Sequence, residues 1–364
     1  MNYIWPILFL LLPIGGQVYA SLRTWQLLPA ILPLRVAVVV LMAVAFVTFF
    51  VSMSGVTNKV SMPAATFLYE VGSSWLVILL YLVMLYGVLD LLKAVHVLPR
   101  EWVSANWLAT GLVTLFMVGL FVYAYLHYDH KERVELTLDS HGKVRRPMRL
   151  VLISDVHLGY HNRRTDLHRW LRLIKQERPD AILIAGDLVD GSIRPVREER
   201  VAEEFRELGI PVYAIPGNHD YYTGMSEDAQ FCREAGIVLL RDSVACLGGD
   251  IVVVGRDDRT NLRRKPLRQL MEGVDTRGRY VIEMDHQPYH LEEAQQAGVD
   301  FEFAGHTHYG QVWPLSWITR AIYEDAFGPL SKGHTQYWVS SGIGIRGPKF
   351  RIGTRSEYIV ATVK

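Results

Sequence analysis

Five short polar clusters, each directly after an apolar run, carry the residues of this sequence that are best suited to chemistry. They are Ser154-Asp155-Val156-His157, Gly186-Asp187, Pro216-Gly217-Asn218-His219-Asp220, Asp285-His286 and Gly305-His306-Thr307-His308. Asp, Asn and His supply the oxygen and nitrogen ligands that suit manganese, iron or zinc ions. Any one cluster alone is more often a turn or a hydrogen-bonded structural residue. All five in order, each after an apolar strand, predict a metal site.

The apolar runs before these clusters have the length of buried strands. We expect strands at Arg133–Leu138, Met148–Ser154, Ala181–Ala185, Val212–Ile215, Ile251–Val254, Tyr280–Met284, Phe301–Phe303, Tyr337–Val339 and Tyr358–Val363. The turn Ser140-His141-Gly142-Lys143 separates the first two strands, as in a hairpin.

Two helices are expected between the strands, because apolar residues recur there at helical spacing. The first helix has Leu167, Trp170, Leu171 and Ile174 on one face, and the second has Val201, Phe205 and Leu208. Strands that alternate with helices predict an α/β sheet core with the ligands at the carboxyl ends of the strands.

The N-terminal third has a different composition from the rest. The chain holds 38 Lys and Arg and 37 Asp and Glu residues, and only eight of them lie in residues 1–128. Four apolar runs, each near the ~20 residues that cross a bilayer as a helix, lie at about Tyr3–Ala20, Leu34–Met53, Trp75–Val95 and Trp107–His127. We therefore expect a transmembrane helical domain at 1–128, a linker and first strand or hairpin at 129–147, and a hydrolytic domain at 148–364.

The first run is expected to be a retained helix and not a cleaved signal peptide, because Met1-Asn2-Tyr3-Ile4-Trp5 lacks positive residues. With four spans, the loops on the side opposite the hydrolytic domain carry Arg23, Arg35, Lys93 and Arg100. Lys59, Lys131 and Arg133 lie on the domain's own side. Because positive residues gather in short cytoplasmic loops, this distribution favours an extracytoplasmic hydrolytic domain.

Charge and cysteine content exclude some classes of protein. A net charge of +1 predicts no general attraction to nucleic acid. Cys232 and Cys246 are too few for a disulfide framework and lack the spacing of metal ligands. The sequence does not indicate an oligomeric state.

The five clusters resemble the motif series of the calcineurin-like metallophosphoesterase superfamily, which is D-x-H, G-D, G-N-H-D/E, H and G-H-x-H. The match covers roughly residues 149–364, and the stretches at 305–314, 339–344 and 350–357 are similar to the membrane-associated bacterial branch. The resemblance implies a two-sheet α/β sandwich flanked by helices. It also implies hydrolysis of phosphate ester or pyrophosphate bonds at a bacterial inner membrane.

The resemblance further implies two divalent metal ions, with Mn²⁺ as the expected ion and Fe, Zn or Mg as alternatives. The implied ligands are Asp155, His157 and His308 for the first ion and Asn218, His286 and His306 for the second. Asp187 would bridge the two ions, since ions ~3.5–4 Å apart need a small anion between them. A hydroxide held by both ions would attack phosphorus in line with the leaving oxygen.

His219, beside the ligand Asn218, is implied to protonate the leaving group or to donate a hydrogen bond to its oxygen, and Asp220 is expected to orient its imidazole. Positive residues that could meet phosphate oxygens are Arg163, Arg164, Arg346, Lys349 and Arg351. The substrate class stays open among phosphomonoesters, phosphodiesters and pyrophosphates, and a lipid-linked substrate would fit the membrane anchor.

Two other functions are considered. A metal-binding membrane sensor or scaffold without turnover is the alternative, and the intact ligand set with His219 argues against it. A transporter with a regulatory domain is disfavoured by the charge-poor spans. One segment, Trp313–Tyr323, has two open interpretations: its large apolar residues either pack on the sheet as core or form a rim in contact with lipid.

Overall fold

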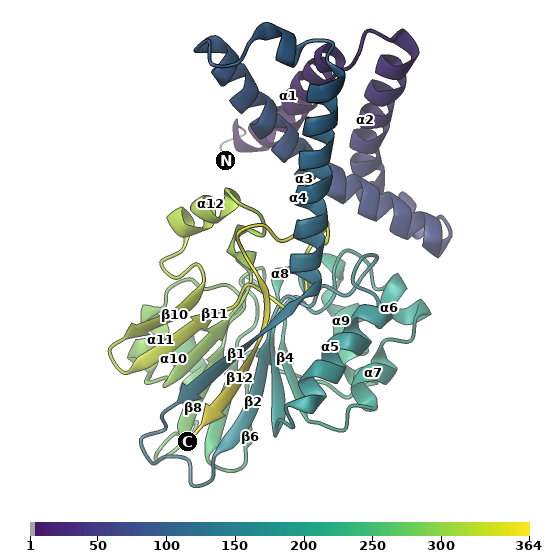
Figure 1. Cartoon of the computed structure of the whole chain (residues 1–364). Helices are drawn as coiled ribbons and strands as arrows, with labels where there is room; N and C mark the ends of the chain where they lie inside the picture. Colours follow the sequence, from purple (N-terminus) through teal and green to yellow (C-terminus); the bar gives the residue numbers. More distant parts are fainter. Residues whose placement is uncertain (1–3) are drawn as a thin grey trace. The chain divides into compact units, whose positions relative to one another are not determined.

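The computed structural model describes residues 4–364, with side chains from residue 11 onward. The chain divides into two compact units, Met1–Tyr125 and Leu126–Lys364 (Figure 1). The first predicted apolar run begins at Tyr3, outside the described residues, and the side chains of its first half also lie outside them.

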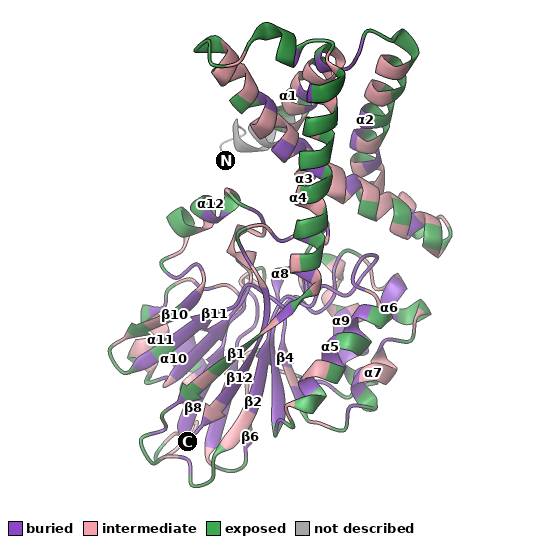
Figure 2. Cartoon of the chain, in the orientation of Figure 1, coloured by how far each residue is buried: buried purple, intermediate pink, exposed green. Residues whose placement is uncertain are grey.

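The N-terminal unit consists of helices. They are α1 (Ile4–Leu27), α2 (Leu32–Met53), α3 (Met62–Ala94) and the greater part of α4 (Trp107–Asp129). Within the described part of the chain, α2, α3 and α4 are long and apolar enough to cross a membrane. Many of their apolar side chains are exposed (Figure 2), as lipid-facing residues are.

Helix α3 begins at Met62, well before the predicted start at Trp75. The polar residues that interrupt the apolar run are accommodated inside the helix. Ser73, for example, donates its hydroxyl to the backbone carbonyl of Tyr69, 2.6 Å away. A hydroxyl bonded to its own helix in this way costs little in lipid, so the helix continues through it.

The C-terminal unit contains two six-stranded sheets, which confirms the expected sandwich. The first sheet has the order β1 (Lys131–Leu138), β12 (Ser356–Val363), β2 (Met148–Ile153), β3 (Ala181–Ala185), β4 (Val212–Ile215) and β5 (Val238–Leu239). The second has the order β10 (Gly328–Lys332), β11 (Thr335–Val339), β9 (Phe301–Ala304), β8 (Tyr280–Met284), β7 (Ile251–Gly255) and β6 (Ser243–Leu247). The facing sides of the sheets enclose a core that includes Leu150, Leu183, Ile282, Phe303 and Ile359.

All nine predicted strands are present, and the three that the sequence did not predict, β5, β6 and β10, are edge strands. The prediction of a hairpin between the first two strands is wrong. The C-terminal strand β12 lies between them, parallel to β1 and antiparallel to β2. Strand β12 is buried along almost its whole length, whereas burial in β1 alternates. An evenly buried strand fits the interior of a sheet, and an alternating one fits its edge.

Helices cover the outer faces of both sheets (Figure 1). On the first sheet they are α5 (Arg164–Gln176), α6 (Arg194–Glu198), α7 (Ala202–Arg206), α8 (Asn218–Thr223) and α9 (Met225–Ala235). On the second sheet they are α10 (Leu267–Met271) and α11 (Glu292–Ala297), and α12 (Leu315–Ile322) follows β9. Both predicted helix faces are buried, with Leu167, Leu171 and Phe205 in one cluster beside the first sheet.

The strand register brings the end of α4 to the same sheet edge as the polar clusters. Lys131, the first residue of β1, pairs with Ser356, whereas Leu152 near the end of β2 pairs with Ile359. Strand β1 therefore begins level with the residues that follow β2, which are the first predicted ligands. One residue separates α4 from β1, and the Tyr128 hydroxyl at the end of α4 donates to Asn162 at 2.7 Å.

Candidate metal centre

The seven predicted ligands converge at one edge of the two sheets. For the first group, His157 Nε2 and His308 Nε2 lie 3.1 Å apart. Asp155 Oδ1 lies 3.5 Å from His308 Nε2 and 3.8 Å from His157 Nε2. Asp155 and His157 are fully buried. Three donor atoms thus face one common point from two different strand ends.

The second predicted group also comes together. Asn218 Oδ1 lies 3.2 Å from His286 Nε2 and 2.9 Å from His306 Nδ1. These residues follow β4, β8 and β9, so three strands from both sheets contribute.

Asp187, after β3, lies between the two groups. Its Oδ2 is 3.5 Å from His157 Nε2 and 3.3 Å from His286 Nε2. One carboxylate therefore reaches a member of each group, which is the position a bridging ligand requires.

The backbone at these strand ends is strained in the way that functional sites often are. Five of the seven residues adopt the left-handed conformation that non-glycine residues rarely use, with φ between 46° and 71°: Asp155, His157, Asp187, His306 and His308. Neighbouring glycines make room for them. A Cβ atom added to Gly217 would collide with the Asp187 carboxylate, and one added to Gly305 would collide with that of Asp155.

The donor set fits two divalent cations. Burial lowers the pKa of His306 to about 4 and that of His308 to about 3, so both rings are neutral at pH 7 and offer a lone pair. Burial would also lower the pKa of His157 and His286, but the carboxylates of Asp155 and Asp187 outweigh it and raise both. A cation placed among these groups would take the role of those protons.

The structure corrects the predicted partner of His219. His219 Nδ1 lies 2.7 Å from Asp190 Oδ1, and not against Asp220. The Asp220 carboxylate instead accepts backbone N–H groups, that of Gly217 at 2.7 Å and that of Val189 at 2.9 Å. Because Asp220 lies in the first turn of α8, its side chain folds back over the start of the helix and holds the loop after β3.

Asp190 is the site residue that the sequence reasoning missed. It follows Asp187 by three positions in the same buried strand-end loop, and a carboxylate in such a loop is the signal that could have found it. Burial would raise the pKa of Asp190, but the hydrogen bond from His219 and the nearby His157 hold it below its usual range. Asp190 is therefore a carboxylate that can fix the tautomer of His219.

Four of the five positively charged residues that were expected to be able to contact phosphate are bonded to other residues of the protein. Arg351 is fully buried and donates to the backbone carbonyls of His308, Ser341 and Gly344. The others pair with carboxylates, Arg163 with Glu199, Arg164 with Glu204 and Lys349 with Asp166. Arg346 is exposed. It follows Ile345, whose carbonyl contacts His161 and Asn162 beside the first ligand loop.

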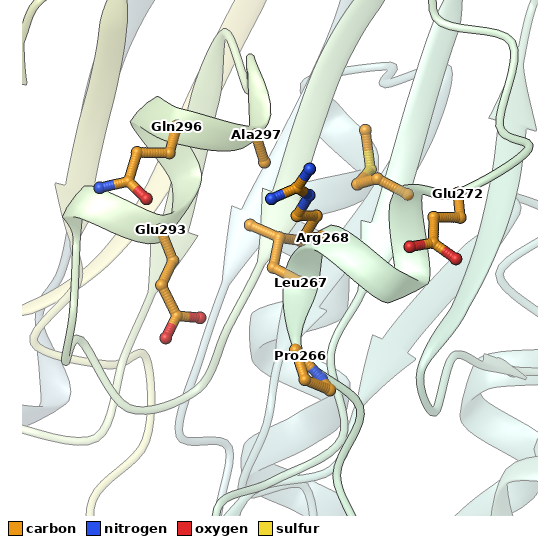
Figure 3. Close-up of a pocket in the computed structure, with 8 residues that line it drawn as sticks. Pro266, Leu267, Arg268, Glu272, Glu293, Gln296 and Ala297 are labelled. Atoms are coloured by element: carbon orange, nitrogen blue, oxygen red, sulfur yellow. The ribbon is translucent and has the colours of Figure 1, made fainter.

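A surface groove of about 690 Å³ lies elsewhere, between α10 and α11 (Figure 3). Leu267 and Arg268 of α10 and Glu272 directly after it line one side, and Glu293 and Gln296 of α11 line the other. It contains none of the predicted ligands, so it is separate from the metal centre.

Comparison with known proteins agrees with this geometry. Residues 148–310 match the calcineurin-like phosphoesterase family. The chain is 31% identical to an uncharacterized metallophosphoesterase of Aquifex aeolicus over 60% of its own length and 85% of that protein. It is 29% identical to a transmembrane protein with metallophosphoesterase domain from Danio rerio, over 77% of this chain and 69% of that one. This chain is a metal-dependent phosphoesterase with three helices long and apolar enough to cross a membrane in its described part, and it belongs to the calcineurin-like metallophosphoesterase family.

Proposed function

We propose that the protein hydrolyses a phosphoester or pyrophosphate bond of a lipid-linked substrate at the membrane, with two divalent ions at the strand ends. One ion would be held by Asp155, His157 and His308, and the other by Asn218, His286 and His306. Asp187 would bridge them. The observation that supports the two-ion centre most directly is the position of the Asp187 carboxylate, within 3.5 Å of a ring nitrogen from each group.

When bound, the ions would supply an activated water and neutralise charge on the phosphoryl group. The protein's own residues would attract the phosphate and supply the proton for the leaving group. The neutral imidazole and amide ligands add no negative charge, so the loaded centre stays positive and attracts a phosphate. Asp190 holds His219 Nδ1, which leaves Nε2 as the ring atom that can give a proton to the leaving oxygen.

Hydrolysis by the purified full chain tests this proposal. We expect cleavage of an aryl phosphate monoester or diester that stops after exhaustive chelation and returns with Mn²⁺. A panel of phospholipids and lipid pyrophosphates, assayed in parallel, would identify the preferred bond. Activity that persists after metal removal would rule out the mechanism. A loaded protein that turns over no phosphate compound would favour the sensor or scaffold.

We also propose that the hydrolytic domain faces away from the cytoplasm of a bacterial cell. The support is the excess of Arg and Lys on the side expected to lie opposite the hydrolytic domain, where Arg23, Arg35 and Lys93 lie near helix ends and Arg100 lies in a short connection. A cysteine at the exposed turn residue His141, in a Cys246→Ser background, should react with a membrane-impermeant maleimide in intact cells. Reaction only after lysis would reverse the orientation.

A further inference from the structure

Helix α12 turns its apolar residues outward. Trp317, Ile318 and Ile322 are 62%, 57% and 56% exposed, whereas the one buried residue of the helix is Ser316. Figure 2 shows most of α12 as exposed. A helix on a water-soluble domain normally has the opposite arrangement, with its apolar stripe on the core. Core packing, one of the two interpretations of this segment, therefore does not account for these side chains.

The helix is fastened at its start to the C-terminal loop and at its end to the loop that carries His306 and His308. Before α12, the backbone N–H of Trp313 donates to the carbonyl of Ile352 at 2.7 Å. After it, the Tyr323 ring lies 6.0 Å from the His306 ring, and Thr307 donates to the Ala326 carbonyl at 2.7 Å. Helix α12 is thus an exposed apolar projection held directly beside predicted metal ligands.

The chain enters the C-terminal unit from α4 at this same edge. Lys131 at the start of β1 is level with the residues after β2, and Tyr128 is bonded to Asn162 in the first ligand loop. Because a single residue joins α4 to β1, the tether is short. If α4 crosses a bilayer, this short tether keeps the edge near the bilayer surface.

The chemistry of α12 also suits a bilayer surface. Tryptophan, with an apolar body and one polar N–H, is enriched at the level of lipid headgroups. Trp313 and Trp317 pack edge to face with ring centroids 5.4 Å apart, and both are exposed. Arg320 on the same helix is exposed as well and could meet anionic headgroups.

We propose that α12 inserts its exposed face, Trp317, Ile318 and Ile322, into the interface of the bilayer in which the chain is anchored. The ligand edge would then open toward the lipid surface, and the substrate would be a phosphate-bearing amphiphile that reaches the metals without leaving the membrane. The second part rests on the proposed phosphoesterase function, whereas the insertion itself does not.

Lipid-dependent quenching tests the insertion without any assay of activity. The full chain, as Ile318→Cys in a Cys246→Ser background, is labelled with bimane and placed in phosphatidylcholine–phosphatidylglycerol nanodiscs that contain doxyl lipid. The matched control is His141→Cys, whose exposed turn lies at the far end of the eight-residue strand β1. We expect doxyl lipid to quench the label at 318 and not that at 141, and aqueous iodide to do the reverse.

Equal iodide quenching at both positions would overturn the proposal, because α12 would then lie in water. Protection of position 318 from both quenchers would overturn it too, since a second copy or another protein would then cover the helix.

A second measurement concerns the substrate. The double variant Trp317→Ser/Ile318→Ser should hydrolyse a bilayer-embedded phosphate ester about tenfold more slowly than the wild type, because two apolar side chains no longer enter the lipid. Its hydrolysis of a soluble aryl phosphate should be unchanged. Equal losses on both substrates would overturn the role in substrate access. If the wild type hydrolyses neither substrate with Mn²⁺, the proposed function fails, while the quenching result still decides the insertion.

Discussion

The floor of the metal centre and helix α12 differ in almost every physical respect, although one loop connects them. The floor consists of buried residues with strained backbone conformations, for example Asp155 and Asp187. Each of them is in contact with several neighbouring residues. Helix α12 exposes its large side chains and buries one serine. The floor contains the predicted metal ligands and the proposed proton donor, and α12 contains none of them. We infer that the chemistry and the source of the substrate are encoded in separate parts of the molecule.

The largest effect on metal binding and activity is expected from a substitution of Asp187, at the centre of the floor. Asp187→Asn removes the charge of the carboxylate that lies between the two ligand groups, so bound metal per chain should fall. Activity on a soluble aryl phosphate should drop at least about 10³-fold, more than the loss of a single active-site hydrogen-bond donor. Metal analysis and kinetics on the purified chain measure both. Asp139→Asn, an exposed carboxylate outside the site, is the matched control. An Asp187→Asn protein with a full metal complement and normal turnover would contradict the bridge.

Replacing His219 should separate chemistry from metal binding. His219→Ala removes the proposed proton donor but none of the proposed ligands, so both ions should remain. The rate should fall ~10²–10⁴-fold for an alkyl ester and least for a nitrophenyl ester, whose leaving oxygen needs no proton. A comparison of the two esters gives this dependence. Equal losses on both esters would mean that His219 acts in some other way.

The roles of Asp190 and Asp220 should differ, although both are buried carboxylates beside His219. Asp190→Asn should slow the reaction about 10–100-fold, as is usual for a residue that orients another. It should add little to His219→Ala in a double variant, because both changes remove one function. Asp220→Asn should instead lower the melting temperature, since its carboxylate holds the backbone of Gly217 and Val189. Full additivity of Asp190→Asn and His219→Ala would show that the two residues act separately.

The sequence predicted most of the floor because the clusters end buried strands. Consecutive parallel strands place their carboxyl ends at one edge, so the positions of Asp155, Asp187 and Asn218 follow from chain order. The same reasoning could have placed Asp190 at this edge, but it could not decide whether Asp190 or Asp220 contacts His219. That choice depends on the turn of α8, which directs Asp220 toward the backbone and leaves His219 facing Asp190.

Two other features required the folded structure. The insertion of β12 between β1 and β2 is a pairing between the two ends of the hydrolytic unit, and no local pattern encodes it. For α12, spacing predicts that Trp317, Ile318 and Ile322 share one face, but not what covers that face. An apolar stripe has the same spacing whether a sheet or a bilayer lies against it.

The smallest effect is expected for the stability of the protein when an exposed apolar residue of α12 is replaced. The comparison is with α5, a helix that has an ordinary buried face. Leu171→Ser in α5 leaves a cavity and buries a hydroxyl, which should cost about 3–5 kcal/mol. In a unit of this size the melting temperature should then fall by about 10 °C. Ile318→Ser makes a comparable change on an exposed face, so its effect on stability should stay within about 0.5 kcal/mol. Thermal unfolding of both full-length variants in the same detergent measures the contrast. A loss for Ile318→Ser that approaches that of Leu171→Ser would show that α12 packs as core, and the separation between a reactive floor and an apolar projection would then be wrong.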